Sequence, residues 1–268
     1  MPFYDAGDAA IYYETTGTGR PLILLHGYAV NSLMWEYQRP VLEKKFQIIL
    51  VDLRSFGKSS CGRRWSGGIM AEDVAGIIKL LDLHNVAILG FSMSGPVAFR
   101  VGLNNSEQVT ALIFAASIFP SAGRPQTANQ IKLLNEEIEI LAQKGVDGWA
   151  MKAGLRTGPL VENMFKQNPE IGQLWDQILA RHNPDYLRAM LAERARVVAK
   201  TNWRERLNEL AQPTMIIAGA QDTRFVDASR YLHRTIARSQ LKIISGAGHM
   251  VNLEKPEEFN RAVIDFLG

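Results

Sequence analysis

Short apolar runs followed by turn residues recur along this chain of 268 residues. The runs are Leu22–Leu25, Phe46–Val51, Val86–Leu89, Ala111–Ala116, Thr214–Ala218 and Leu241–Ile244. Runs of this length without polar alternation are typical of strands that are buried on both faces. Between them, Ile69–Leu81 and Pro96–Leu103 carry apolar residues at helical spacing. Strands that alternate with helices predict an α/β fold with a parallel central sheet and flanking helices.

The first residues of the chain follow another pattern. The segment Ile11–Gly19, which reads IYYETTGTG, predicts a strand that ends in a glycine turn. Such a strand is typical of an antiparallel hairpin at the edge of a sheet. We therefore expect a mixed sheet that is mostly parallel.

Between residues 121 and 203 no β-rich run occurs. Helical spacing is found there in Ile131–Leu141, Gly172–Ala180 and Asp185–Val198. Breaks fall at Gly145, Gly158-Pro159, Asn168-Pro169 and Asn183-Pro184. They predict about four helices, with Asn or Asp placed to cap the next helix. We expect a core domain of residues 1–120 and 204–268 and an all-helical cap of residues 121–203, which lies as a lid over the carboxyl ends of the strands.

Composition and charge narrow the possible partners. Lys and Arg total 30 against 27 Asp and Glu, so a net charge of +3 gives no support for nucleic-acid binding. Cys61 is the only cysteine and cannot form an internal disulfide, and the acidic start of the chain is unlike a signal peptide. The apolar run Ala111–Phe119 is too short to span a bilayer. We expect a cytoplasmic protein without a membrane partner, either a monomer or a homodimer.

A strand, a sharp turn and a helix surround Ser92. The turn reads Gly90-Phe91-Ser92-Met93-Ser94-Gly95 and lies between the run at Val86 and the helical pattern from Pro96. This is the setting of a nucleophile elbow, in which small residues must lie two positions before and after the serine. Gly90 meets that requirement, and Ser94 replaces the usual second glycine but is small. Ser92 is the predicted nucleophile.

A serine hydroxyl needs a nearby base and a carboxylate that orients the base. Of the five histidines, only His249 lies in a loop directly after the last predicted strand. Asp222 follows the preceding predicted strand, so both side chains are expected at the same edge of the sheet as Ser92. Asp227 is a weaker alternative acid. The predicted triad is Ser92, Asp222 and His249, in the chain order found in α/β-hydrolases.

Over nearly its full length the chain resembles the α/β-hydrolase fold superfamily, in its serine-nucleophile branch with a helical cap. His26-Gly27-Tyr28 is similar to the family's His-Gly turn, Asp52–Ser59 to its Asp-x-Arg-Gly-x-Gly-x-Ser loop with Ser55 in place of a glycine, and Gly246–Glu254 to its histidine loop. The resemblance implies an oxyanion hole formed by the backbone N–H groups of Tyr28 and Met93, with His26 in a structural role.

Cofactor and metal motifs are absent from the sequence. Gly57-Lys58-Ser59 lacks the earlier glycine of a phosphate loop because that position is Asp52. The Gly246 segment follows the last strand, where a dinucleotide fingerprint would follow the first. No two histidines are close enough in sequence for a local metal motif. We expect a reaction without metal or cofactor.

The motifs place Tyr28 and Met93 beside Ser92, and we also assign Trp149 and Met164 of the cap to the substrate pocket. The leading hypothesis is a hydrolase of a small carboxylic ester or lactone that forms an acyl-enzyme. The same triad could cleave a carbon–carbon bond next to a ketone or catalyse perhydrolysis. A binding protein or receptor with little turnover is the alternative from another class.

Overall fold

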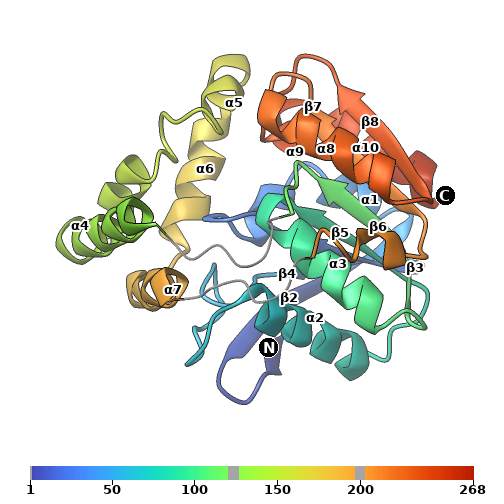
Figure 1. Cartoon of the computed structure of the whole chain (residues 1–268), viewed down its shortest axis with the longest axis horizontal. Coiled ribbons are helices and arrows are strands. Elements are labelled where there is room, and N and C mark those ends of the chain that lie inside the picture. Colours follow the sequence, from blue (N-terminus) through green and yellow to red (C-terminus); the bar gives the residue numbers. More distant parts are fainter. Residues whose placement is uncertain (1, 120–126, 197–202) are drawn as a thin grey trace.

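The structure is a computed structural model that describes residues 2–119, 127–196 and 203–268. Within these residues the strands form one eight-stranded sheet in the order β1-β2-β4-β3-β5-β6-β7-β8 (Figure 1). The strands are β1 Phe3–Asp5, β2 Ala10–Thr16, β3 Arg20–Leu25, β4 Phe46–Val51, β5 Val86–Phe91, β6 Val109–Ala115, β7 Thr214–Gly219 and β8 Ser239–Ile244. β2 is antiparallel to β1 and β4, and all other neighbours are parallel. The predicted α/β class with a mostly parallel sheet is confirmed.

The apolar runs predict the central strands because most residues of these strands are buried. Every residue of β5 and β7 is buried, as expected for strands covered by helices on both faces. In β8, at the edge, exposed or half-buried residues extend up to Ile244. β1 has only three residues, too few for a pattern to predict.

The antiparallel edge differs from the expected hairpin in its partner. β2 forms its hairpin with β1, which precedes it, while the glycine turn at Gly17 and Gly19 leads to β3. β3 is not a neighbour of β2 because β4 lies between them. A Cβ on Gly17 would lie 2.4 Å from the Phe46 carbonyl oxygen, so this turn needs glycine to pass the start of β4.

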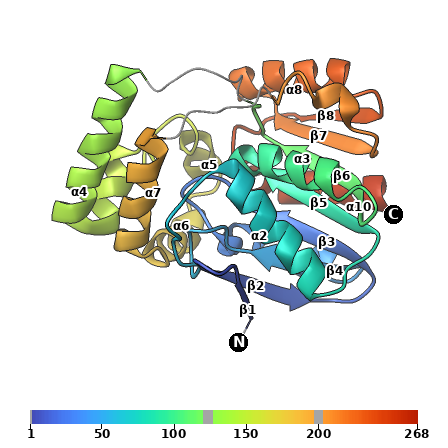
Figure 2. The ribbon, with the colours of Figure 1, turned by 60° about the horizontal axis from the view of Figure 1, so that its bottom comes forward.

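Helices cover both faces of the sheet. They are α1 Arg39–Leu42, α2 Gly67–Leu80, α3 Gly95–Asn104, α8 Thr223–Thr235, α9 Val251–Glu254 and α10 Pro256–Leu267. Figure 2 shows α2 and α3 in front of the sheet and α10 behind it. α3 packs on β5 and β6, and α8 packs on β7 and β8. In the described part of the chain, no helix is both long and apolar enough to cross a membrane.

Four further helices form a separate layer beside the sheet (Figures 1 and 2). They are α4 Ala128–Lys152, α5 Glu162–Gln167, α6 Ile171–Ala180 and α7 Pro184–Arg196, and we call them the helical insert. The break expected at Gly145 is present, since its φ of 64° interrupts α4. Asn183 caps α7 by accepting the N–H groups of Asp185 and Tyr186 at 2.9 and 3.2 Å. The expected insert boundary at residue 121 lies outside the described residues.

The end of α6 makes one set of contacts between the insert and the core. The Asn31 side chain donates to the Ile178 carbonyl at 2.7 Å. The buried His182 ring accepts the Gly57 N–H at 3.0 Å and donates to the Ala29 carbonyl at 3.1 Å. Burial lowers the pKa of His182 to about 4. A neutral imidazole therefore joins the insert to two core loops.

Candidate active site

Ser92 lies at the sharp turn between β5 and α3. Its φ of 51° is in the left-handed region, which is strained for a serine and typical of a nucleophile elbow. A Cβ on Gly90 would lie 2.4 Å from the Ser94 carbonyl oxygen, so the turn closes only with glycine there. A larger residue two positions before Ser92 would therefore clash across the turn.

Ser94 does more than supply a small side chain. Its buried hydroxyl donates to the backbone carbonyl of His26, at the end of β3. This hydrogen bond joins the elbow to the neighbouring loop that carries Gly27 and Tyr28. A second glycine, as in the usual motif, could not make it.

His249 lies between Ser92 and Asp222. Its Nε2 is 3.1 Å from the Ser92 Oγ, and its Nδ1 is 2.6 Å from the Asp222 Oδ2. These distances are within hydrogen-bond range, and the chain of contacts matches a serine nucleophile, a base and an orienting acid. The Phe225 and Phe91 rings contact the imidazole, with centroids 4.3 and 5.6 Å from it.

Each of these three side chains follows a parallel strand at its carboxyl end. Ser92 follows β5, Asp222 follows β7, and His249 lies in the loop after β8. Asp227, the weaker alternative acid, is one turn farther along α8, where its exposed carboxylate lies 3.5 Å from Arg230. The structure brings Asp222, and not Asp227, to the imidazole.

The loop that carries His249 is held by Glu254, whose role no local sequence pattern predicts. The buried Glu254 carboxylate accepts the N–H of Gly248 at 2.7 Å and the N–H of Met250 at 3.0 Å. These are the two residues that flank His249. The Asn163 side chain, from α5 of the insert, also donates to this carboxylate. Glu254 therefore links the histidine loop to the insert.

The turn from His26 to Tyr28 lies beside the elbow. A Cβ on Gly27 would lie 3.1 Å from the Phe91 ring and 3.6 Å from the Ser92 Cβ, so glycine lets the two loops approach. In the described part of the chain the Tyr28 N–H has no acceptor. His26 has a structural place, since its Nε2 accepts the Leu53 N–H at 2.9 Å and its Nδ1 contacts the Gly27 carbonyl at 2.7 Å. Burial lowers the pKa of His26.

The loop that begins at Asp52 contacts this turn through the Leu53 N–H and has an internal network of its own. Asp52 accepts the N–H groups of Ser32 and Lys58 at 2.7 and 2.9 Å. Arg54 makes a bidentate ion pair with the buried Asp73, at 2.7 and 2.8 Å. Ser55, where the family loop has glycine, has a φ of 74°. The serine is thus held in a conformation that glycine adopts without strain.

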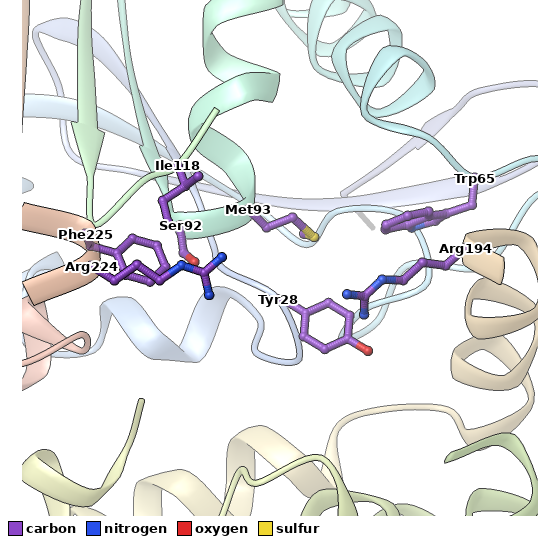
Figure 3. Close-up of a pocket in the computed structure, with 8 residues that line it drawn as sticks. All are labelled: Tyr28, Trp65, Ser92, Met93, Ile118, Arg194, Arg224 and Phe225. Atoms are coloured by element: carbon purple, nitrogen blue, oxygen red, sulfur yellow. The ribbon is translucent and has the colours of Figure 1, made fainter. Parts of the chain in front are cut away.

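A cavity of about 270 Å³ opens at Ser92 (Figure 3). It is lined by Tyr28, Trp65, Ser92, Met93, Ile118, Arg194, Arg224 and Phe225. Tyr28 and Met93 were expected here, whereas Trp149 and Met164 are absent from this lining and are fully buried elsewhere. The Trp149 ring packs edge to face against the Tyr28 ring, with the two ring centroids 6.4 Å apart. Its Nε1–H donates to the Glu137 carboxylate at 2.9 Å. It therefore lies behind Tyr28.

Five residues that line the cavity were not predicted from the sequence. Ile118 follows the end of β6, and Arg224 and Phe225 follow Asp222, so their places beside strand ends were a usable signal. Trp65 and Arg194 come from a loop and from α7, and nothing in the local pattern points to the cavity. Among the described residues, no three His, Cys, Asp or Glu side chains are grouped to hold a metal ion.

Comparison with known proteins agrees with this architecture. A family model described as "alpha/beta hydrolase fold" matches residues 20–256. The chain belongs to the alpha/beta hydrolase fold family. The family assignment covers the elbow, the acid and the histidine loop in one continuous match.

Three relatives of this alpha/beta hydrolase show the range of activities found among similar proteins. A 2-hydroxy-6-oxononadienedioate/2-hydroxy-6-oxononatrienedioate hydrolase of Cupriavidus pinatubonensis is 29% identical, over 96% of this chain and 90% of its own. A thermophilic esterase from Thermogutta terrifontis has a TM-score of 0.82 at 28% identity, over 97% of this chain and 93% of its own. A bromoperoxidase from Bacillus anthracis has a TM-score of 0.75 at 27% identity, over 97% and 95%.

Proposed function

We propose that the protein is a serine hydrolase that cleaves a small carboxylic ester or lactone through an acyl-enzyme. The observation that carries this proposal is the unbroken contact from Asp222 through His249 to Ser92, at 2.6 and 3.1 Å. Family membership and the esterase among the similar structures support it. No metal or cofactor takes part in the proposed reaction.

In the proposed mechanism the Ser92 Oγ attacks the carbonyl carbon while His249 Nε2 accepts the hydroxyl proton. Asp222 holds the other ring nitrogen, which keeps the imidazole in the tautomer that can accept at Nε2 and stabilises the imidazolium. His249 then returns the proton to the leaving alcohol. A water molecule, activated by His249, hydrolyses the acyl-enzyme.

The developing negative charge on the carbonyl oxygen needs donors that are already in place. We assign this role to the backbone N–H groups of Tyr28 and Met93. Their position is supported by the close approach of Gly27 to Ser92 and by the absence of an acceptor for the Tyr28 N–H within the described residues.

Hydrolysis of a carbon–carbon bond is the second candidate function. It is supported by the 29% identity with the hydrolase from Cupriavidus pinatubonensis. Perhydrolysis is a further use of the same triad, supported by the likeness to the bromoperoxidase. Ester substrates distinguish these functions, because an esterase should hydrolyse simple esters far faster than it cleaves a vinylogous diketone or forms a peracid from acetate.

A panel of p-nitrophenyl esters of increasing acyl length tests the proposal. We expect turnover of short esters, a sharp fall for long acyl chains because the insert limits the cavity, and no jump when the substrate forms micelles. Ser92→Ala should remove this activity. A protein that turns over no ester would instead support a binding role, and interfacial activation on long esters would show that the insert opens onto lipid.

A further inference from the structure

Two arginines line the cavity at Ser92, and no acidic residue does. Arg194 comes from α7 of the insert and Arg224 from the first turn of α8 in the core. The other lining residues are Ser92, Met93, Ile118 and three aromatic side chains. The Asp222 carboxylate, two residues before Arg224, is already bonded to His249. The cavity therefore carries a local positive charge that the nearly balanced composition of the chain does not predict.

Neither arginine has a carboxylate within ion-pair distance in the described part of the chain. The remaining residues, 1, 120–126 and 197–202, include no Asp or Glu. Arginines one or two turns away on the same helices behave differently. Arg188 on α7 pairs with Asp185 at 3.0 Å, and Arg230 on α8 pairs with Asp227 at 3.5 Å.

Arg194 is also held in place. Its guanidinium carbon lies over the Tyr28 ring, 4.7 Å from the ring centre, so a cation–π contact holds the group beside the cavity. In the view of Figure 3, Arg224 and Phe225 lie at the Ser92 end of the cavity and Arg194 and Trp65 at the other end. Arg194 is half-buried, and Arg224 is exposed at the rim.

We infer that the enzyme selects substrates that carry a carboxylate at a fixed distance from the scissile ester or lactone carbonyl, with that carboxylate bound by Arg194. Arg224 adds long-range attraction at the entrance. This inference rests on the proposed function, and it assigns the substrate class of the same site. A half-ester of a linear dicarboxylic acid has the required chemistry, since one end is an ester and the other an anion.

Planar guanidinium groups recognise carboxylates through paired N–H donors, and the interaction is stronger where water is largely excluded. Binding energy from this remote group can be used at the reacting carbonyl if the distance between them is right. A rigid spacing between Arg194 and Ser92 therefore predicts an optimum in the length of the dicarboxylic chain. A neutral ester of the same shape would leave the guanidinium without a partner.

The test compares monoethyl esters of succinic, glutaric, adipic and pimelic acid with their carboxamide analogues, which have the same shape but no charge. Proton release is followed in a pH-stat. We expect the best acid to exceed its amide at least tenfold in kcat/KM, with a clear optimum in chain length. In Arg194→Gln the ratio of kcat/KM for the acid to kcat/KM for its amide should fall at least tenfold. The optimum in chain length should disappear. In Arg224→Gln the ratio should fall two- to threefold, in a way that salt suppresses.

Arg188→Gln and Arg230→Gln are the matched controls, because they remove an exposed, paired arginine from the same two helices. They should leave the acid-to-amide ratio unchanged. Equal kcat/KM for acids and amides in the wild type, with simple esters still hydrolysed, would overturn the inference and leave the proposed function intact. A larger effect of Arg224→Gln than of Arg194→Gln would also overturn the assignment.

A binding measurement tests the inference even if no ester is turned over. Titration of the Ser92→Ala protein with succinate, glutarate, adipate and pimelate and with their diamides, followed by calorimetry, should detect binding of the dianions alone. Arg194→Gln should weaken this binding at least tenfold. Failure of the dicarboxylates of all four lengths to bind would contradict the inference, whereas binding without any ester hydrolysis would contradict the proposed function alone.

Discussion

The sheet core and the helical insert contribute to the site in different ways. In the core, Ser92, Asp222 and His249 each follow the carboxyl end of a parallel strand, and Glu254 accepts the backbone N–H groups of both neighbours of His249. The insert supplies Arg194 to the cavity and buries most of its large side chains, including Trp149 and Met164. We infer that the core determines the reaction and that the insert determines which substrates reach it.

The largest effect should follow from a change in the core that leaves the fold intact. Asp222→Asn presents an amide to His249 Nδ1, which favours the wrong imidazole tautomer, so kcat should fall about 10⁴-fold. Circular dichroism should show that the protein remains folded. Asp227→Asn, one turn away and paired with Arg230, should change kcat less than twofold. A large loss there with an active Asp222→Asn protein would identify Asp227 as the acid.

The junction between the two regions predicts a dependence of stability on pH. Burial lowers the pKa of His182 to about 4, while an unfolded histidine titrates near 6.5. As the pH falls below 6.5 the unfolded state takes up the proton first, so about 3 kcal/mol of the free energy of unfolding should be lost between pH 6.5 and 4. Above pH 6.5 this contribution is fully present.

His182→Asn should remove this pH-dependent part of the free energy of unfolding. Urea unfolding at a series of pH values, compared between the wild type and the variant, isolates it because His26 and the carboxylates are common to both proteins. The two stability curves should diverge as the pH rises from 4 to 6.5. Parallel curves would mean that the imidazole at the junction is not held neutral.

The Glu254→Gln variant tests whether Glu254 positions His249. Glu254→Gln replaces a carboxylate that accepts two flanking N–H groups with an amide that can accept through only one oxygen, so kcat should fall about 10- to 100-fold while KM changes little. Glu257→Gln, at an exposed position on α10, is the control. Equal changes in kcat for the two variants would show that Glu254 does not position His249.

The smallest effect is expected at Ser94. Ser94→Ala removes the donor to the buried His26 carbonyl, which should lower the free energy of unfolding by about 1 to 2 kcal/mol. Thermal unfolding measures this loss, and the exposed Ser106→Ala serves as the reference. A stability equal to that of the reference variant would mean that the serine matters only because it is small.

The sequence predicts some features of the site better than others, and the difference depends on whether a feature leaves a local pattern. Strands buried on both faces leave continuous apolar runs, and residues just beyond them, such as Ser92, Asp222 and His249, must meet at one edge of the sheet. Contacts that depend on how distant segments pack leave no local pattern. The Glu254 carboxylate, the His182 ring and the Ser94 hydroxyl all belong to this second group.

The insert shows why helical patterns predict lining residues poorly. An amphipathic pattern indicates which face of a helix is buried, but not whether it faces a cavity or another helix. Trp149 and Met164 lie on buried faces but are absent from the cavity lining, whereas Arg194, a polar residue near the end of α7, reaches the cavity. The docking of the insert, through Asn31 and His182, decides this outcome.

The most direct test of Ser92 as the nucleophile is covalent labelling with a p-nitrophenyl phosphonate, followed by mass spectrometry of the intact chain and of its peptides. We predict one phosphonyl group per chain, on Ser92, together with complete loss of ester hydrolysis. Ser92→Ala should take up no label. Stoichiometric labelling at another residue, or ester hydrolysis that persists at the wild-type rate in Ser92→Ala, would contradict the proposed mechanism.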